Sequence, residues 1–140
     1  MYRKPDWEAA LAAYLEPLRL VPFAWGTHDC CTFAGGAVLA MTGVDPMAEF
    51  RGRYSTELGA KRALRRIGRG TLVATLDAKF EAVAASLAQR GDVVMIDGLL
   101  AICWGAFAIA VGREDDREGL IRIDRHQWHD ARAWRVAYGA

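Results

Sequence analysis

The residues Asp29-Cys30-Cys31-Thr32-Phe33, within the segment WGTHDCCTFAGG of residues 25–36, mark the start of a helix. Asp29 is a residue type that caps helix N-termini, and Gly43 stands where a helix would end. Between them, apolar side chains recur on one helical face: Phe33, Ala34, Ala37, Val38 and Met41. This spacing predicts a helix that begins at Cys30 and stops before Gly43.

On this prediction the two adjacent cysteines occupy the first two positions of the helix. A helix N-terminus carries unpaired N–H groups and about half a positive charge, both of which stabilise a thiolate. The same N–H groups can stabilise an oxyanion beside the sulfur. Cys30 is therefore the candidate nucleophile, with Asp29 and Cys31 as candidates for supporting it or the oxyanion. The alternative is that both cysteines only fill space, since free cysteine is among the most buried residue types.

The second half of the chain has the pattern of short strands. GDVVMID at residues 91–97 contains four consecutive apolar residues after a Gly-Asp turn, which is typical of a strand buried on both faces. Further strands are predicted in LLAICW, AFAIAVG, LIRID and WRVAY. A polar loop is predicted in REDDREG at 113–119, and a helical turn in HQWHDARA at 126–133.

The first half has helical patterns in addition to the helix at Cys30. One helix is predicted after Asp6, and another is predicted between a capping Ser55 and Gly68. A short helix is predicted in TLVATLDAKF at 71–80.

Helices followed by strands indicate the α+β class with an antiparallel sheet. We predict one domain over residues 1–140, mainly helical in 1–86 and mainly strands in 87–140. Its helices pack on a small antiparallel sheet of about five strands.

The composition is that of a globular protein, with 53% hydrophobic and 25% charged residues. A formal net charge of +1 gives no overall field toward nucleic acid or a membrane, so nucleic acid is an unlikely partner. No apolar run approaches the ~18 residues that span a bilayer. Asp6, Glu8 and Glu16 interrupt the apolar region that a signal peptide needs, so we expect folding in a cytosol. Three cysteines, an odd number, argue against a disulfide framework.

Two segments carry a family resemblance. WGTHDCCTF resembles the nucleophile segment of the NlpC-type, papain-like cell-wall peptidases, whose Asp-Cys-Ser-Gly-Phe motif opens the central helix. Asp29 to Phe33 occupy that motif, with Cys31 in the place of the serine. LAQRGDVVMI at 87–96 resembles the Gly-Asp strand that starts the family's sheet. The resemblance implies a papain-like, NlpC-like fold with Cys30 as the nucleophile of amide cleavage in peptidoglycan.

A branch of this fold found in phages, prophages and gene-transfer particles is more similar still. Its shared segments are WG..DC at 25–30, FRGRY at 50–54, GDVV at 91–94 and AWR at 133–135. This resemblance implies a protein near the distal tail, with tail-tip or baseplate proteins and peptidoglycan as partners. It also implies assembly in the host cytoplasm and a final location in the virion or particle tail.

The resemblance fails at the catalytic base. In the NlpC-type family a histidine opens the strand after the Gly-Asp strand, and alignment on Gly105 places Leu99 there. Leucine cannot transfer a proton. His28 is the remaining candidate base, although a turn histidine bonded to the backbone is the alternative. For the third polar residue of the family's site, the next strand offers Arg122 and Asp124.

The sequence leaves a metal reading and a non-catalytic reading open. A zinc site could draw four ligands from His28, Cys30, Cys31, Cys103, His126 and His129, but no C-x-x-C spacing is present and we expect neither metal nor cofactor. His126 and His129 are expected at the surface. The non-catalytic reading is a structural or adaptor protein of the same fold.

The region of residues 51–70 is strongly basic, with Glu57 as its only acid. Lys61, Arg65 and Arg69 recur at helical spacing on one face. A solvated helix face is one interpretation. The other is contact with an anionic partner such as an acidic subunit or a wall polymer.

Overall fold

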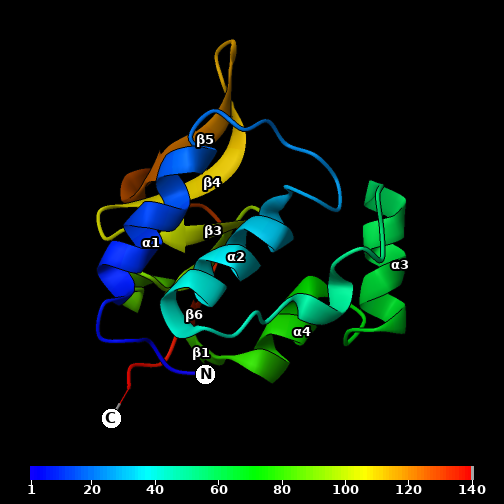
Figure 1. Cartoon of the computed structure of the whole chain (residues 1–140), viewed down its shortest axis with the longest axis horizontal. Coiled ribbons are helices and arrows are strands. Elements are labelled where there is room, and N and C mark those ends of the chain that lie inside the picture. The colour runs from blue at the N-terminus through cyan, green and yellow to red at the C-terminus, as the bar shows by residue number, and fades with distance from the viewer. Residues whose placement is uncertain (140) are drawn as a thin grey trace.

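The computed structural model describes residues 1–139 and has the predicted α+β architecture (Figure 1). Its helices are α1 (Trp7–Leu15), α2 (Cys30–Thr42), α3 (Glu57–Arg66) and α4 (Leu72–Lys79), with short 3-10 turns η1 (Glu16–Leu18), η2 (Ala48–Phe50), η3 (Ala85–Leu87) and η4 (Arg125–Gln127). Its strands are β1 (Glu81–Val83), β2 (Val93–Ile96), β3 (Leu99–Cys103), β4 (Phe107–Glu114), β5 (Arg117–Asp124) and β6 (Ala131–Arg135). Ala140, at the end of the predicted strand-rich part, lies outside the described residues.

The six strands form one antiparallel sheet in the order β1-β6-β2-β3-β4-β5. The sequence predicted about five strands and missed β1, whose three residues pair with β6. The predicted loop at 113–119 is instead a hairpin, because β4 and β5 stay paired up to Glu114 and Arg117. The predicted turn at 126–133 is a 3-10 turn only at its start, and β6 begins at Ala131.

The helices begin and end close to the predicted positions. Helix α2 starts at Cys30, and Gly43 ends it in the left-handed region at φ +82°. The cap of α3 is Thr56, not the predicted Ser55, because the Thr56 hydroxyl accepts a hydrogen bond from the N–H of Gly59. Asp6 precedes α1 as predicted but its side chain forms no capping bond.

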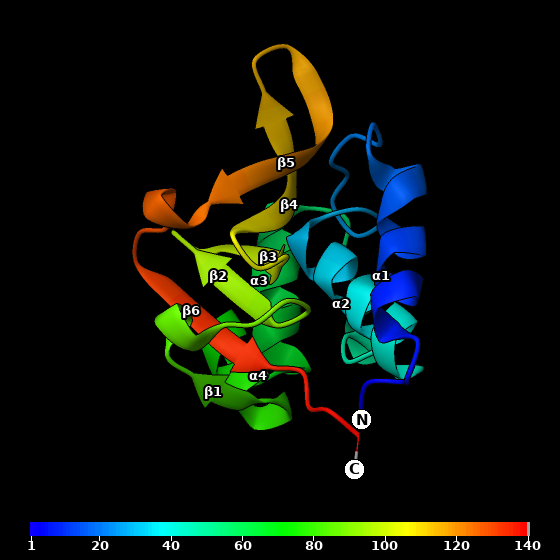
Figure 2. The same cartoon turned by 90° about the vertical axis from the view of Figure 1, so that its left-hand side faces the viewer.

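Helices α1 and α2 cover one face of the sheet (Figure 2). Alternation along β3 sends Leu100 and Ile102 into the core beneath these helices. Leu99 and Cys103 contact the smaller apolar cluster on the opposite face. All four residues of β2 are buried, as its unbroken apolar run predicted.

The two ends of the described chain meet at a buried carboxylate. Asp92, which is 0% exposed, pairs with Arg3 at 2.8 Å and Arg135 at 2.9 Å. It also accepts hydrogen bonds from the N–H groups of Gln89 and Val136. The GDVV and AWR segments therefore hold the N-terminal segment against the sheet, and Arg3 forms a β-bridge with Tyr138 near the other end of the described chain, at the lower end of the molecule in both views (Figures 1 and 2).

Candidate functional site

The start of α2 is held by a fully bonded, buried carboxylate. Asp29 is 1% exposed. Its Oδ1 accepts from the N–H of Thr32 at 2.9 Å, and the Thr32 hydroxyl accepts from the N–H of Asp29 at 2.8 Å. Its Oδ2 accepts from the N–H of Gly26 at 2.8 Å and from the Tyr54 hydroxyl at 2.7 Å. Asp29 therefore fixes the helix start, and both of its oxygens are already bonded within the chain.

Gly26 and Tyr54 bring two sequence segments together at this cap. Gly26 has φ +82°, and a Cβ built on it would lie 2.2 Å from the carbonyl oxygen of Tyr54. Only glycine permits both that backbone conformation and that approach. Arg51 of the same FRGRY segment donates to the carbonyl of Thr32 at 3.2 Å and pairs with Asp45. The FRGRY segment is therefore a brace for the first turn of α2.

Cys30 lies at the first position of α2, as the sequence predicted. A hydrogen bond with the neighbouring Cys31 thiol lowers the pKa of Cys30, and backbone hydrogen bonds with Leu100 and with its own residue lower it further. Burial and the charge of Asp29 oppose this effect. The sulfur therefore lies beside the start of β3, in surroundings that favour the thiolate.

Cys31 has the opposite environment. Its hydrogen bond to Cys30 and its burial raise its pKa, so Cys31 keeps its proton while Cys30 ionises first. Cys31 lines a small apolar pocket between α2 and α3 with Met47, Phe50, Tyr54, Ala60 and Leu64. This difference in pKa favours the protonated Cys31 thiol as a donor toward the Cys30 thiolate.

His28 is half-buried in the turn before α2, with its ring edge-on to Phe33. Its Nε2 atom is buried and has no hydrogen-bond partner among residues 1–139. Burial lowers the pKa of His28, against the opposing charge of Asp29, so the imidazole is neutral near pH 7. Its backbone is bonded to Ala24 in both directions. No hydrogen bond joins the Nε2 of His28 to the sulfur of Cys30 in the described part of the chain.

The strand position that faces α2 is Leu100. Alignment on the family motif indicated Leu99, but Leu99 packs on the opposite face of the sheet. Leu100 is 0% exposed and belongs to the core that contains Phe33 and contacts Cys30. The residue of this strand that lies beside Cys30 is therefore a leucine, which cannot transfer a proton.

The other predicted polar residues lie elsewhere. Arg122 and Asp124 pair with each other at 2.7 Å, and Arg122 lies over the ring of Phe107. His126 is exposed, and His129 pairs with Asp97 at 3.1 Å in the turn between β2 and β3.

A zinc site built from all three cysteines would need thiols that lie on opposite faces of the sheet. Cys103 is buried in the cluster opposite α2, where Arg125 approaches its sulfur to 3.6 Å. Burial raises the pKa of Cys103. Within residues 1–139 no group of three or more His, Cys, Asp or Glu residues is arranged to hold a metal ion.

Sequence reasoning missed the roles of Tyr54 and Arg51 at this site. Their segment was noticed as a shared motif, yet nothing in its spacing placed it against residues 29–32. The glycine of WG..DC was the available clue, since a glycine in a fixed motif indicates a close backbone approach.

Comparison with curated proteins gave no match, and comparison with solved structures gave none. None of the helices in residues 1–139 has the length and apolar character needed to cross a membrane. A family model described as "Domain of unknown function (DUF6950)" matches residues 2–136, and the chain therefore belongs to that family.

Proposed function

We propose that this chain is an NlpC-like, papain-like domain at the tail tip of a phage or phage-like particle, where Cys30 cleaves an amide bond of cell-wall peptide. One observation carries the proposal: Cys30 opens a capped helix beside an antiparallel sheet, and its surroundings lower the pKa of its thiol. The helix-then-strand order and the WG..DC segment support the kinship.

The proposed chemistry uses the Cys30 thiolate, the free N–H groups of the first turn and the imidazole of His28. The Cys30 thiolate attacks the carbonyl carbon, forming a C–S bond, while the free N–H groups of the first turn stabilise the oxyanion. The C–N bond then breaks, and the amine leaves with a proton that the imidazole of His28 took from the thiol. Water hydrolyses the thioester, which releases the acid and restores the thiol.

One observation favours a second candidate, a non-catalytic adaptor in the tail tip. Leu100 occupies the strand position that faces α2, and the Nε2 of His28 makes no hydrogen bond to the sulfur among residues 1–139. Without a positioned base, general-base help of about 10²–10⁴-fold is lost. An adaptor of the same fold needs no base.

Digestion of purified peptidoglycan separates the two candidates. Wild-type protein should release peptide fragments, and Cys30→Ala should release none. The matched control is Cys31→Ser, which places a serine where the resembling family has one and should keep activity. His28→Ala should lower the rate by about 10²-fold or more if His28 is the base.

The adaptor candidate predicts a different set of results. Wild type and Cys30→Ala would both leave peptidoglycan intact, and both would assemble into particles normally. That pair of results excludes Cys30 as a nucleophile.

A further inference from the structure

Charge is segregated along this chain. Between Arg51 and Arg69, seven of the eight charged residues are basic, which gives the segment a net charge of +6. Because the whole chain carries +1, the remainder carries −5. A near-neutral total therefore conceals a basic region, centred on α3 at the edge of the molecule (Figure 1).

Three arginines of this region line a single groove of about 310 Å³, defined here as the arginine groove: Arg53, Arg62 and Arg66. Arg53 comes from the loop before α3. Arg62 and Arg66 are four residues apart on α3, so they share a face and lie about 6 Å apart along its axis. Guanidinium groups thus reach the groove from two segments of the chain.

No acid lines the arginine groove. Its other lining residues are Gly52, Gly59, Ala63 and Ile67. The three arginines are exposed, and within residues 1–139 none of them forms an ion pair or a side-chain hydrogen bond. Their charge is therefore open to an external anion.

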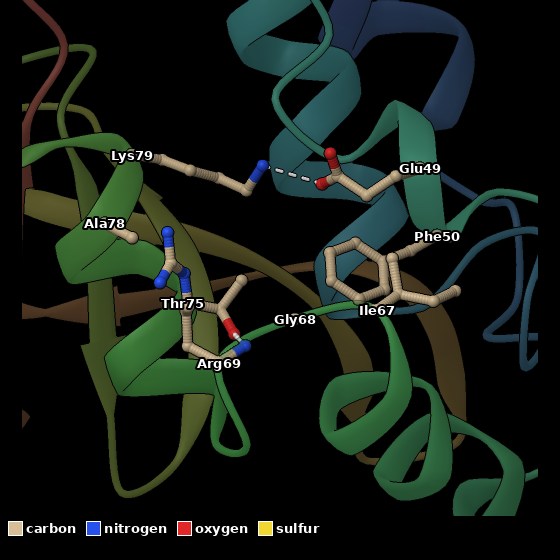
Figure 3. A pocket seen from close by; sticks show the side chains of 8 residues that line it. All are labelled: Glu49, Phe50, Ile67, Gly68, Arg69, Thr75, Ala78 and Lys79. Carbon is tan, nitrogen blue, oxygen red and sulfur yellow. Dashed lines mark hydrogen bonds and ion pairs between the residues drawn. The ribbon is translucent and has the colours of Figure 1, made fainter.

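The neighbouring pocket on the other side of Ile67 provides a contrast (Figure 3). There Lys79 points to Glu49 and pairs with it at 2.6 Å. That pocket neutralises its lysine within the chain and leaves Arg69 as its one cation without an ion pair among residues 1–139, whereas all three arginines of the arginine groove lack one. The two sites differ in the charge left for a ligand.

We propose that the arginine groove binds the phosphate groups of a polyol-phosphate polymer. One guanidinium group can bind two oxygens of a phosphate at once. Three guanidinium groups carry more positive charge than a single carboxylate could neutralise. The spacing along α3 suits successive charges of a linear polymer. No aromatic side chain lines the groove, whereas sites for single-stranded nucleic acid stack bases on aromatic rings. A polymer without bases is therefore the better match.

Calorimetric titration of the full chain with poly(glycerol phosphate) oligomers at several salt concentrations tests this assignment. Wild type should bind with a strong salt dependence. Arg62→Ala/Arg66→Ala should weaken binding and reduce the salt slope by about 2, because each arginine removed leaves one phosphate without its neutralising charge. The matched control, Arg113→Ala/Arg117→Ala, removes the same charge from the β4–β5 hairpin and should bind as wild type does.

Two results would overturn the proposal. Equal weakening by both double variants would mean that only total charge matters. Tighter binding of a single-stranded DNA with the same number of phosphates would assign the groove to nucleic acid. Cys30→Ala should bind like wild type, so the outcome is independent of any peptidase activity.

Discussion

The residue scale is where the candidate chemistry is decided. Cys30 and Cys31 are neighbours in sequence, yet one thiol is surrounded by hydrogen-bond donors and the other lines an apolar pocket. Helix position alone does not distinguish them, because both lie in the first turn. The difference comes first from the hydrogen bond between the two thiols, which lowers the pKa of Cys30 and raises that of Cys31, and then from the backbone of Leu100 in β3, which lowers the pKa of Cys30 further.

We predict that iodoacetamide alkylates Cys30 at lower pH than either other cysteine. The thiolate is the reacting form, and a lowered pKa keeps it present as pH falls. Cys31 and Cys103 should react only at higher pH, because burial raises the pKa of both thiols and the hydrogen bond to Cys30 raises that of Cys31 further. Mass spectrometry of the labelled chain over a pH series measures this order.

The contribution of the Cys31 hydrogen bond to the lowered pKa of Cys30 can be tested on its own. Cys31→Ala should move Cys30 alkylation to higher pH, because the largest cause of its lowered pKa is removed. Cys103→Ala serves as the control and should leave the Cys30 profile in place. An unchanged profile in Cys31→Ala would show that the helix start alone stabilises the thiolate.

Two glycines with the same backbone conformation test the brace at the start of α2. Gly43→Ala, at φ +82° in open space, should cost about 1–2 kcal/mol for the left-handed backbone alone. Gly26→Ala, also at φ +82°, should cost clearly more, because its methyl group would collide with the Tyr54 carbonyl. Urea denaturation measures both free energies of unfolding, and equal values would mean that the Tyr54 segment moves away freely.

At the scale of elements, the two-residue period of β3 decides which side chain meets α2. Leu100 and Ile102 face the helices, and Leu99, Ala101 and Cys103 face away. The motif alignment selected Leu99 as the base position, and the structure places Leu99 on the face of the sheet away from α2. The placement matters because a shift of one residue along a strand moves the side chain to the other face of the sheet.

Histidine substitutions test which face of the sheet each of the two leucines occupies. Leu100→His should add to the pH profile of Cys30 alkylation a step in the range where imidazoles titrate, about pH 5–8, because a nearby imidazolium lowers a thiol pKa. Leu99→His is the matched variant and should leave the profile unchanged. Identical profiles for the two variants would contradict the assignment of faces.

At the scale of the whole molecule, Asp92 joins segments from both ends of the chain. It pairs with Arg3, which is 5% exposed, and with Arg135 at the end of β6. With two guanidinium partners and two N–H donors, the buried carboxylate of Asp92 has its charge and its hydrogen-bonding capacity fully matched. Removing it would take the opposite charge away from both arginines. The sheet and the N-terminus are therefore coupled through one side chain.

We expect Asp92→Ala to lower the free energy of unfolding by about 3–5 kcal/mol, because it leaves the buried guanidinium of Arg3 without the carboxylate that neutralises its charge. Glu118→Ala breaks the exposed pair with Arg113 and should cost about 0–1 kcal/mol. Thermal and urea denaturation compare the two. Similar losses would show that the Asp92 network contributes no more than a surface pair.

The sequence by itself determined the class of fold and the start of the central helix. Capping residues and apolar periodicity act over a few neighbouring residues, so Asp29, Gly43 and the run in β2 were readable from local pattern. The short strand β1 was not, because its three residues form a strand only by pairing with β6, which lies far along the chain.

Only the tertiary structure decided what surrounds the Cys30 sulfur. The Tyr54 brace, the approach of Leu100 and the separation of Cys103 onto the other face all depend on contacts between distant segments. Such contacts are set by how the sheet twists, alternates and packs under the helices, and local residue patterns carry no record of them.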